Sequence, residues 1–430
     1  MKNSNINALI DKCIIGITVM VFILAFGFKI YNFNFLGIYL MIINIYMILK
    51  YKDKKIFLLM IMMFYFNYSF VVCKYIGEES NLLKSLYAQL SSKNTMLAGI
   101  LFQILFLVII NIILGNKKNN VEISCDGNIF FRYRKWVIFE LQILLIIILF
   151  YHLIKKITVN TTLFEYSIIL FIFLLYLCKN DKKNRIFSEI ILLLFAIYSL
   201  KNGDRIAVLQ FMIVDFSINY IEKIKKSTII LFIIGGIFIF TFLGLYGDIL
   251  DAGKDMKVLN FEYTIQNIKD RRLALDTSVS AYFSGLSMID VSNKYTIKER
   301  IKDGIIYFTN YTLNGARSGY IQVGDKIRDY QINYGGGFLT CYFYFWFGWI
   351  GVMLISVYIG IILKKIFYSQ KHKMYVYIFT IYFVSTAPRW YMYAPSLLFR
   401  GFIFFNIIYL LIKILLNGGL KRKNARETIN

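Results

Sequence analysis

The sequence predicts an all-α integral membrane protein with about 12 transmembrane helices. Hydrophobic residues make up 58% of the 430 positions, which is more than a water-soluble core can bury. Apolar runs of about 20 residues recur along the chain, and each is long enough to cross ~30 Å of hydrocarbon. Lysine and arginine gather between alternate runs, which accounts for a net charge of +24 without nucleic-acid binding. These observations exclude a water-soluble globular protein.

Each predicted span is a mainly apolar run bounded by charged or turn-forming residues. In chain order the spans are 13–30, 33–49, 56–73, 96–114, 136–154, 163–178, 186–200, 206–222, 228–246, 338–363, 374–392 and 397–416. No small-residue cleavage site follows the first run, so we predict a retained helix and not a removed signal peptide. Asp215 falls inside the eighth span, where a functional acid and a structural hydrogen bond are both open interpretations.

The charge of the short loops predicts that both termini lie in the cytoplasm. Lysine and arginine are concentrated in the loops after every second span and in the C-terminal tail. The chain then divides into helices one to nine, a long external loop, helices ten to twelve and a basic cytoplasmic tail. These four parts cover 1–246, 247–337, 338–416 and 417–430. Long translocated loops are exempt from the charge rule, so the basic residues of the external loop do not contradict this topology.

The external loop is predicted to have structure of its own. Its segments 261–288 and 297–311 place apolar residues at helical spacing with polar residues between them. We expect short helices that lie on the membrane surface. A loop of this length usually carries function.

No cofactor or metal site is predicted. The nearest look-alike of a nucleotide-binding loop, Gly247 to Lys254, has the wrong glycine spacing and is followed by Asp255. His152 and His372 are the two histidines, so a zinc-binding pair at the metalloprotease spacing is excluded. Asp248, Asp251 and Asp255 share one helix face, which suits a solvated first turn better than a cation site.

Arginines and aromatic residues gather in the segments predicted to lie outside. Arg205 follows the turn Asn202-Gly203-Asp204. The other arginines of this group are Arg317, Arg389 and Arg400, and its aromatic residues are Trp390 and Tyr391. An arginine fork binds phosphate oxygens well, but each arginine could instead snorkel or pair with Asp204, Asp325 or Asp329. The aromatic pair suits an interfacial belt or a platform for sugar rings.

Three segments resemble the bacterial O-antigen and capsular polysaccharide polymerases of the Wzy type. The first is Asn202-Gly203-Asp204-Arg205, which opens a span after an outer turn. The second is Gly336-Gly337-Phe338, continued by Phe347-Gly348-Trp349-Ile350-Gly351, where the long loop enters span ten. The third is Pro388-Arg389 with Pro395 and Arg400, before and within the last span. The chain departs from the family pattern before Phe347, where Tyr342 and Trp346 stand in place of an acid and an asparagine.

The resemblance implies a metal-independent membrane glycosyltransferase in the bacterial cytoplasmic membrane. It would join oligosaccharide repeat units carried on undecaprenyl pyrophosphate, at the outer face and without a cofactor. In this interpretation Arg205, Arg317, Arg389 and Arg400 bind the two pyrophosphates and Trp390 and Tyr391 contact sugar. Asp204 or Asp325 orients or deprotonates the acceptor hydroxyl. The implied partners are the lipid-linked oligosaccharides, the bilayer, a chain-length regulator and a flippase.

Two other functions remain open on the sequence. An O-antigen ligase-like transferase would share the layout, but we expect it to use an outer histidine as its base, and 247–337 contains none. A 12-helix polysaccharide or lipid transporter would also have both termini inside. Transporters tend to have internal repeats and glycine- or proline-broken helices at mid-membrane, and neither is visible in this sequence.

Overall fold

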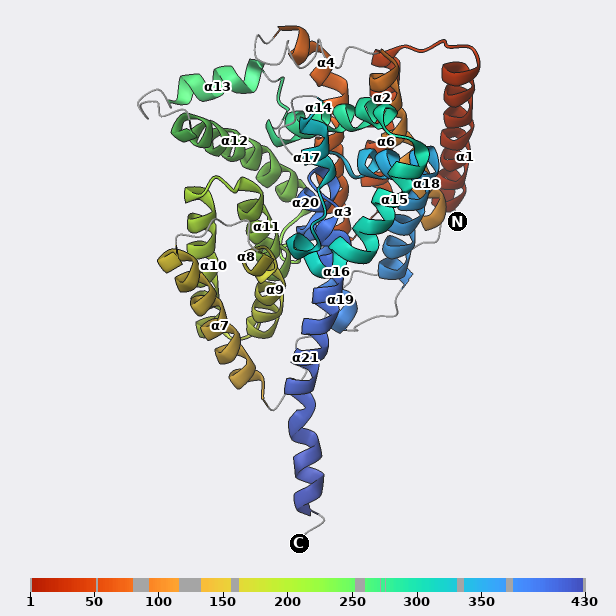
Figure 1. The fold of residues 1–430 in the computed structure, drawn as a ribbon. Coiled ribbons are helices and arrows are strands. Elements are labelled where there is room, and N and C mark those ends of the chain that lie inside the picture. Colours follow the sequence, from red (N-terminus) through yellow and green to blue (C-terminus); the bar gives the residue numbers. More distant parts are fainter. Residues whose placement is uncertain are drawn as a thin grey trace. The chain divides into compact units, whose positions relative to one another are not determined.

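The computed structural model is helical, with no strand among the residues that it describes (Figure 1). These residues are 2–51, 53–79, 93–115, 133–155, 162–251, 260–270, 272–274, 276–330, 336–368 and 374–427. They form two compact units. The first unit comprises 1–122, 236–369 and 389–396, and the second comprises 123–235, 370–388 and 397–430.

The first unit contains the N-terminal helices and the segment predicted to form the external loop. The N-terminal helices are α1 (Lys2–Phe22), the π-helix η1 (Ile23–Gly27), α2 (Phe33–Lys50), α3 (Lys54–Asn67), α4 (Ser69–Glu79) and α6 (Lys93–Leu114). Asn32 and Asp53 begin α2 and α3, because each side chain accepts hydrogen bonds from two backbone N–H groups of the first turn.

The segment predicted as the external loop is folded into a series of short helices. They are α13 (Phe261–Asp270), α14 (Asp276–Val291), η4 (Ser292–Lys294), α15 (Ile297–Ile306), η5 (Tyr307–Tyr311), α16 (Thr312–Asn314), η6 (Gly315–Ser318) and α17 (Val323–Arg328). The long helix α18 (Leu339–Tyr368) follows.

The core of the first unit is built around α6 and α18. The Phe102 ring of α6 lies 4.6 Å from the rings of both Tyr344 and Trp349 of α18. Further along, Gly360 brings α18 so close to α6 that an added Cβ would lie 2.7 Å from the Ile113 Cδ1 atom. Close backbone approach at a glycine is a common way to pack helices in membranes.

The expectation of surface helices throughout the long loop is wrong for α14. This helix contacts α4, α6, α17 and α18, and nearly all of its side chains are buried. Its Gly285 lies against Cys341 of α18, where an added Cβ would be 3.0 Å from the sulfur. Small residues such as Ser278, Ser284 and Ser287 allow this approach. By contrast, Phe261 and Tyr263 of α13 are exposed, as a surface helix requires.

The second unit packs around one helix that is buried except at a single residue. It contains α7 (Arg134–Lys155), α8 (Thr162–Glu165), α9 (Ser167–Cys178), α10 (Lys182–Lys201), α11 (Arg205–Asp215), the π-helix η2 (Phe216–Tyr220), α19 (Met374–Ser385) and α21 (Ser396–Glu427). Every residue of α9 except the partly buried Leu170 is buried. Phe171 of α9, Phe195 of α10 and Phe211 of α11 pack with ring centroids 5.0–5.9 Å apart. Two helices, α12 (Lys226–Asp251) and α20 (Ala387–Met392), are divided between the units, and the first residue of α21, Ser396, also belongs to the first unit.

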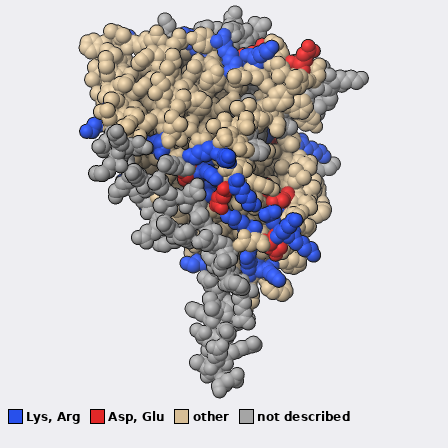
Figure 2. All heavy atoms as spheres, turned by 180° about the vertical axis from the view of Figure 1, so that it is seen from behind, with Lys and Arg blue, Asp and Glu red and all other residues tan. Residues whose placement is uncertain are grey.

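The chain is a multi-pass membrane protein by the length and composition of its helices. Among the residues that the structure describes, seven helices are long and apolar enough to cross a bilayer. They are Ile6–Gly27, Phe33–Lys50, Lys54–Tyr75, Asn94–Leu114, Arg134–Lys155, Leu339–Phe367 and Ser396–Leu416. The α7 helix exposes Phe139, Ile143 and Ile147 on one side and buries its other side, as a lipid-facing helix does. Figure 2 shows one face of the protein, where charged side chains gather in groups beside broad areas that carry none.

The other five predicted spans are also helical, but they fall outside this set. Three of them coincide with shorter apolar helices, Leu163–Cys178, Lys226–Gly236 and Met374–Ser385. The remaining two are α10 and the α11–η2 pair. The count of twelve spans therefore stays a prediction.

Candidate functional site

The candidate site is built on α15, which begins with a capping box. The Thr296 hydroxyl accepts a hydrogen bond from the Glu299 N–H, and the Glu299 carboxylate accepts one from the Thr296 N–H at 2.8 Å. These two bonds satisfy donors that a helix start leaves free. They fix the residue at which α15 begins, and with it the direction of every later side chain.

A glycine sets the distance between α15 and α18. A Cβ added at Gly304 would lie 2.5 Å from the Phe347 Cζ atom and 3.0 Å from the Trp346 Cβ atom. No larger residue fits at this position without movement of α18 or of its rings. The backbone of α15 is therefore held directly against α18.

Arg300 fastens α15 to a break in α18. Gly348 has φ 62° and ψ −149°, so the helix is interrupted at this residue. An interruption leaves the carbonyls of the preceding turn without their usual donors. The Arg300 guanidinium donates to two of these, the backbone carbonyls of Tyr344 and Phe345. Arg300 thereby ties α15 to α18 directly before the break.

Asp303 is the hub of the site and is 9% exposed. Its Oδ2 atom accepts hydrogen bonds from the Tyr320 hydroxyl at 2.9 Å and from Trp346 Nε1 at 3.1 Å. Its Oδ1 atom pairs with the Lys326 ammonium. A carboxylate has about four acceptor positions, so about one remains on Oδ1 for a ligand. The donors come from α17, α18 and the segment between η6 and α17.

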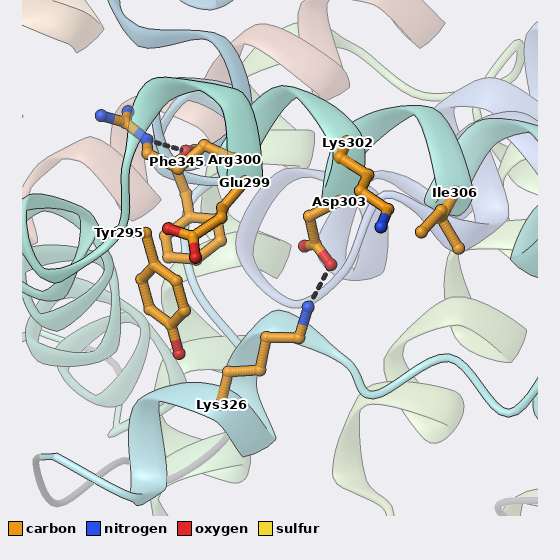
Figure 3. A pocket seen from close by; sticks show the side chains of 8 residues that line it. All are labelled: Tyr295, Glu299, Arg300, Lys302, Asp303, Ile306, Lys326 and Phe345. Carbon is orange, nitrogen blue, oxygen red and sulfur yellow. Dashed lines mark hydrogen bonds and ion pairs between the residues drawn. The ribbon is translucent and has the colours of Figure 1, made fainter.

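A pocket of about 190 Å³ opens beside this carboxylate. Figure 3 shows Lys326 reaching from α17 towards Asp303, with Tyr295 and Glu299 to one side and Lys302 and Ile306 to the other. Arg300 and Phe345 complete the lining. Three cations and two carboxylates therefore line one small cavity. Such a lining suits a polar ligand that carries negative charge and hydroxyl groups.

Tyrosine and tryptophan rings surround the hub. The Tyr307 ring lies 4.5 Å from Trp346 and 5.8 Å from Tyr320, and the Tyr311 ring lies 5.4 Å from Tyr320. Burial, followed by the neighbouring Asp303 carboxylate, raises the pKa of Tyr320 well above its ordinary value. Burial and a hydrogen bond with Tyr330 raise the pKa of Tyr295 to about 12. Both phenols are thus neutral hydrogen-bonding groups at physiological pH.

Two of the residues predicted to act at the site begin α11 in the second unit. Asp204 is the N-cap, and its carboxylate accepts a hydrogen bond from the Ala207 N–H at 3.0 Å. Gly203, with φ 75°, makes the turn before it. Arg205 is the first helical residue and is partly exposed. The motif therefore builds a helix start, which accounts for the residue types at 203 and 204 on structural grounds.

Asp325 and Arg317 belong to the first unit, and Asp325 lies outside the lining of the pocket. Asp325 is 55% exposed and pairs with Arg328 at 3.0 Å on the same helix. Exposed pairs of this kind contribute little, and the carboxylate remains open to solvent. The backbone of Arg317 lies in η6, while its side chain lies outside the described part of the structure.

The predicted sugar-contacting rings are buried in the first unit. Trp390 is 1% exposed and Tyr391 is 0% exposed, so neither ring is open to a sugar in this structure. The Tyr391 hydroxyl lies 2.8 Å from Asn67 Oδ1 and 3.0 Å from Gln103 Oε1. A phenol has one proton, so the Tyr391 hydroxyl donates to one of these two amide oxygens at a time. Arg389 precedes these rings in α20 and is half-buried.

Arg400 lies one turn into α21 in the second unit, between two rings. Its guanidinium carbon is 5.6 Å from the Tyr166 ring centroid and 5.5 Å from that of Phe404. Its buried Nε has no hydrogen-bond partner among the described residues. His152 is buried in the same unit, where its Nδ1 lies 2.8 Å from the Ile148 carbonyl. Within the described ranges, no group of three or more potential metal ligands is close enough to hold a metal ion.

Sequence reasoning missed Arg300, Asp303 and Lys326. The available signal was local: Arg300 and Asp303 are three residues apart on an amphipathic helix, directly before a glycine. The contacts of Asp303 with Lys326 and Trp346 join segments far apart in the sequence, so no periodic pattern in the sequence indicates them.

Comparisons with family models, curated proteins and solved structures found no match to this chain.

Proposed function

We propose that the protein is a metal-independent glycosyltransferase of the bacterial cytoplasmic membrane. It would polymerise oligosaccharide repeat units linked to undecaprenyl pyrophosphate into O-antigen or capsular polysaccharide. The pocket beside Asp303 carries this proposal, because it combines a buried carboxylate, cations and aromatic rings in the segment before α18. Carboxylates and aromatic rings suit sugar hydroxyls and ring faces, and cations suit pyrophosphate.

The proposed topology has twelve transmembrane helices, both termini in the cytoplasm and residues 247–337 outside. α10 supports the higher count, because this 20-residue helix exposes Ile186, Leu193 and Ile197 as a lipid-facing helix would. Labelling of single cysteines in a cysteine-free background tests the orientation. A cysteine at Asn293 should react with an impermeant reagent in intact cells, and one at Lys365 should be protected. The reverse pattern would exclude an external pocket.

In the proposed reaction, a hydroxyl oxygen of one lipid-linked unit bonds to the anomeric carbon of another. The bond between that carbon and the pyrophosphate oxygen breaks, and the pyrophosphate leaves with the electron pair. The hydroxyl proton passes to a base, for which the free acceptor position of Asp303 Oδ1 is the candidate in the first unit. Lys302 and Lys326 line the same pocket and would stabilise the charge that develops on the leaving pyrophosphate.

Arg400 supports a second contact with phosphate in the second unit. A buried guanidinium N–H without an acceptor is costly, and a phosphate oxygen would satisfy it. Arg205, Arg317 and Arg389 stay in the proposal as pyrophosphate-binding residues because of the resemblance. Trp390 and Tyr391 do not, because their burial leaves no ring face open.

Gene deletion and complementation test the function. The deletion strain should make single repeat units on its surface and no long polymer, while transport of units continues. Wild type should restore polymer, Asp303→Asn should not, and Asp325→Asn should restore it because that carboxylate is exposed and outside the pocket. Polymer length on a gel is measured against the amount of protein in the membrane. Accumulation of units in the cytoplasmic leaflet would replace this proposal with a transporter.

A further inference from the structure

The outward side of α15 carries a stripe of exposed isoleucines. Ile297, Ile301 and Ile305 are 72%, 39% and 52% exposed. They recur every four residues, so they form one stripe along the helix that is about 12 Å long. Exposed aliphatic groups in register are a contact surface for another apolar group. All three side chains are exposed in the part of the first unit that the structure describes.

Two lysines separate this stripe from the pocket. Counting about 100° per residue, the isoleucines cover about 0–80° of the circumference and Lys298 and Lys302 about 100–140°. Glu299 and Asp303, which line the pocket, lie at about 200–240°. The remaining side of the helix, with Arg300 and Gly304, faces α18. Three chemical zones therefore follow one another around the outward side of α15.

The order of the zones matches the order of groups in one kind of molecule. An aliphatic chain suits the isoleucine stripe, a phosphate or pyrophosphate suits the two lysines, and a hydroxyl-rich head suits the carboxylates of the pocket. Lys302 both lines the pocket and belongs to the basic zone, so the two zones are continuous. A phospholipid would satisfy the first two zones and leave the pocket empty.

We propose that α15 binds a polyprenyl pyrophosphate-linked sugar across these three zones. The prenyl chain lies along Ile297, Ile301 and Ile305, the pyrophosphate lies against Lys298 and Lys302, and the first sugar enters the pocket at Asp303. This site rests on the proposed function for the identity of the sugar-bearing lipid. The arrangement of the zones does not depend on the proposed function, and binding experiments alone test it.

Photocrosslinking tests the lipid contact in the full-length protein in phosphatidylcholine nanodiscs. A benzophenone amino acid is placed at Ile305, or at Ile42 of α2, which is also 52% exposed. The probe is tritium-labelled undecaprenyl pyrophosphate. Labelling should be strong at 305 and weak at 42. Equal labelling at both positions would show that the stripe contacts the probe no more specifically than any exposed apolar helix does, and it would overturn the proposal.

Competition and charge reversal test the middle zone. Unlabelled undecaprenyl pyrophosphate should abolish labelling at 305, while undecaprenol, inorganic pyrophosphate and phosphatidylglycerol at the same concentration should not. The double variant K298E/K302E should bind the probe about tenfold more weakly. The matched control K294E changes an exposed lysine outside the three zones and should bind normally. Full competition by undecaprenol or phosphatidylglycerol, or unchanged binding by the double variant, would overturn the proposal.

The two proposals fail separately. Labelling at 305 in a protein that makes no polymer would support the lipid site and contradict the polymerase function. Polymer formation without labelling at 305 would support the polymerase function and contradict a lipid site on α15.

Discussion

Breaking the Asp303–Lys326 pair from each side in turn separates its structural role from its chemical role. In Asp303→Asn, the amide oxygen can still accept from Tyr320 and Trp346, but an amide group faces the Lys326 ammonium. The two side chains are 11% and 22% exposed, so the remaining ammonium is mostly out of water. Removing one member of a buried pair costs about 3–5 kcal/mol. Partial exposure of Lys326 lowers our expected loss of unfolding free energy to about 2–3 kcal/mol.

The opposite change should cost less. In Lys326→Met the carboxylate keeps two neutral donors, so we expect a loss of about 1–2 kcal/mol. The double variant removes both charges and should be at least ~1 kcal/mol more stable than the sum of the single losses predicts. Unfolding in mixed micelles gives these values, and polymer length on a gel gives activity.

The combination of the two measurements decides the role of the pair. Activity should stay low in the double variant even where stability returns, because the pocket then lacks the Asp303 carboxylate and the Lys326 ammonium. Strictly additive losses of stability would show that the two charges do not interact in the folded protein. Normal polymer in the double variant would give the pair a purely structural role.

Three further predictions concern other parts of the molecule. Gly304→Ala should lower the thermal midpoint because the new methyl would lie 2.5 Å from a ring of α18, whereas Gly16→Ala, which meets nothing within 4 Å, should leave it unchanged or raise it. Arg205→Lys should reduce polymer roughly 30- to 1,000-fold at normal protein abundance if Arg205 grips phosphate through its planar fork, and Lys201→Arg should not. Hydrogen bonds from the N-cap lower the pKa of Glu299, so its support of the α15 start is complete above the ordinary glutamate pKa of 4.5 and is lost as pH falls through the lowered value. Amide hydrogen exchange at 297–300, corrected for its intrinsic pH dependence, should therefore show less protection at about pH 3 than at about pH 6, and equal protection would contradict this role of the carboxylate.

The positions of the helices could be predicted from the sequence because hydrophobic runs are a local signal. All twelve predicted segments fall on helices. The number of helices that span a membrane is harder to predict. Helices such as α9 are short and almost entirely buried, and burial inside a protein requires the same apolar composition as exposure to lipid. α14 shows the same ambiguity: its apolar spacing fits a surface helix, but its small residues let it pack inside the first unit.

The site could be predicted only in its general location. The long segment before α18 was expected to carry function, and the pocket lies in it. The particular residues could not be predicted, because Asp303 obtains its partners from positions 17, 23 and 43 residues away. The acids that the sequence favoured have local roles: Asp204 caps α11, and Asp325 pairs within α17. Turn and cap positions select the same residue types as catalysis does, so a motif alone does not distinguish them.

Two of the segments that carried the resemblance meet in the first unit, and this gives them a physical reason to occur together. The Gly337 N–H donates to the Met392 carbonyl at 3.0 Å, and the Tyr342 hydroxyl donates to the Tyr393 carbonyl at 2.7 Å. The turn between α20 and α21 is thereby fixed to the start of α18. Trp346, one turn after Tyr342, carries the indole that holds Asp303. The glycines at the start and at the break of α18 thus act indirectly, because they set the position of α18, which lines the pocket together with α15 and α17.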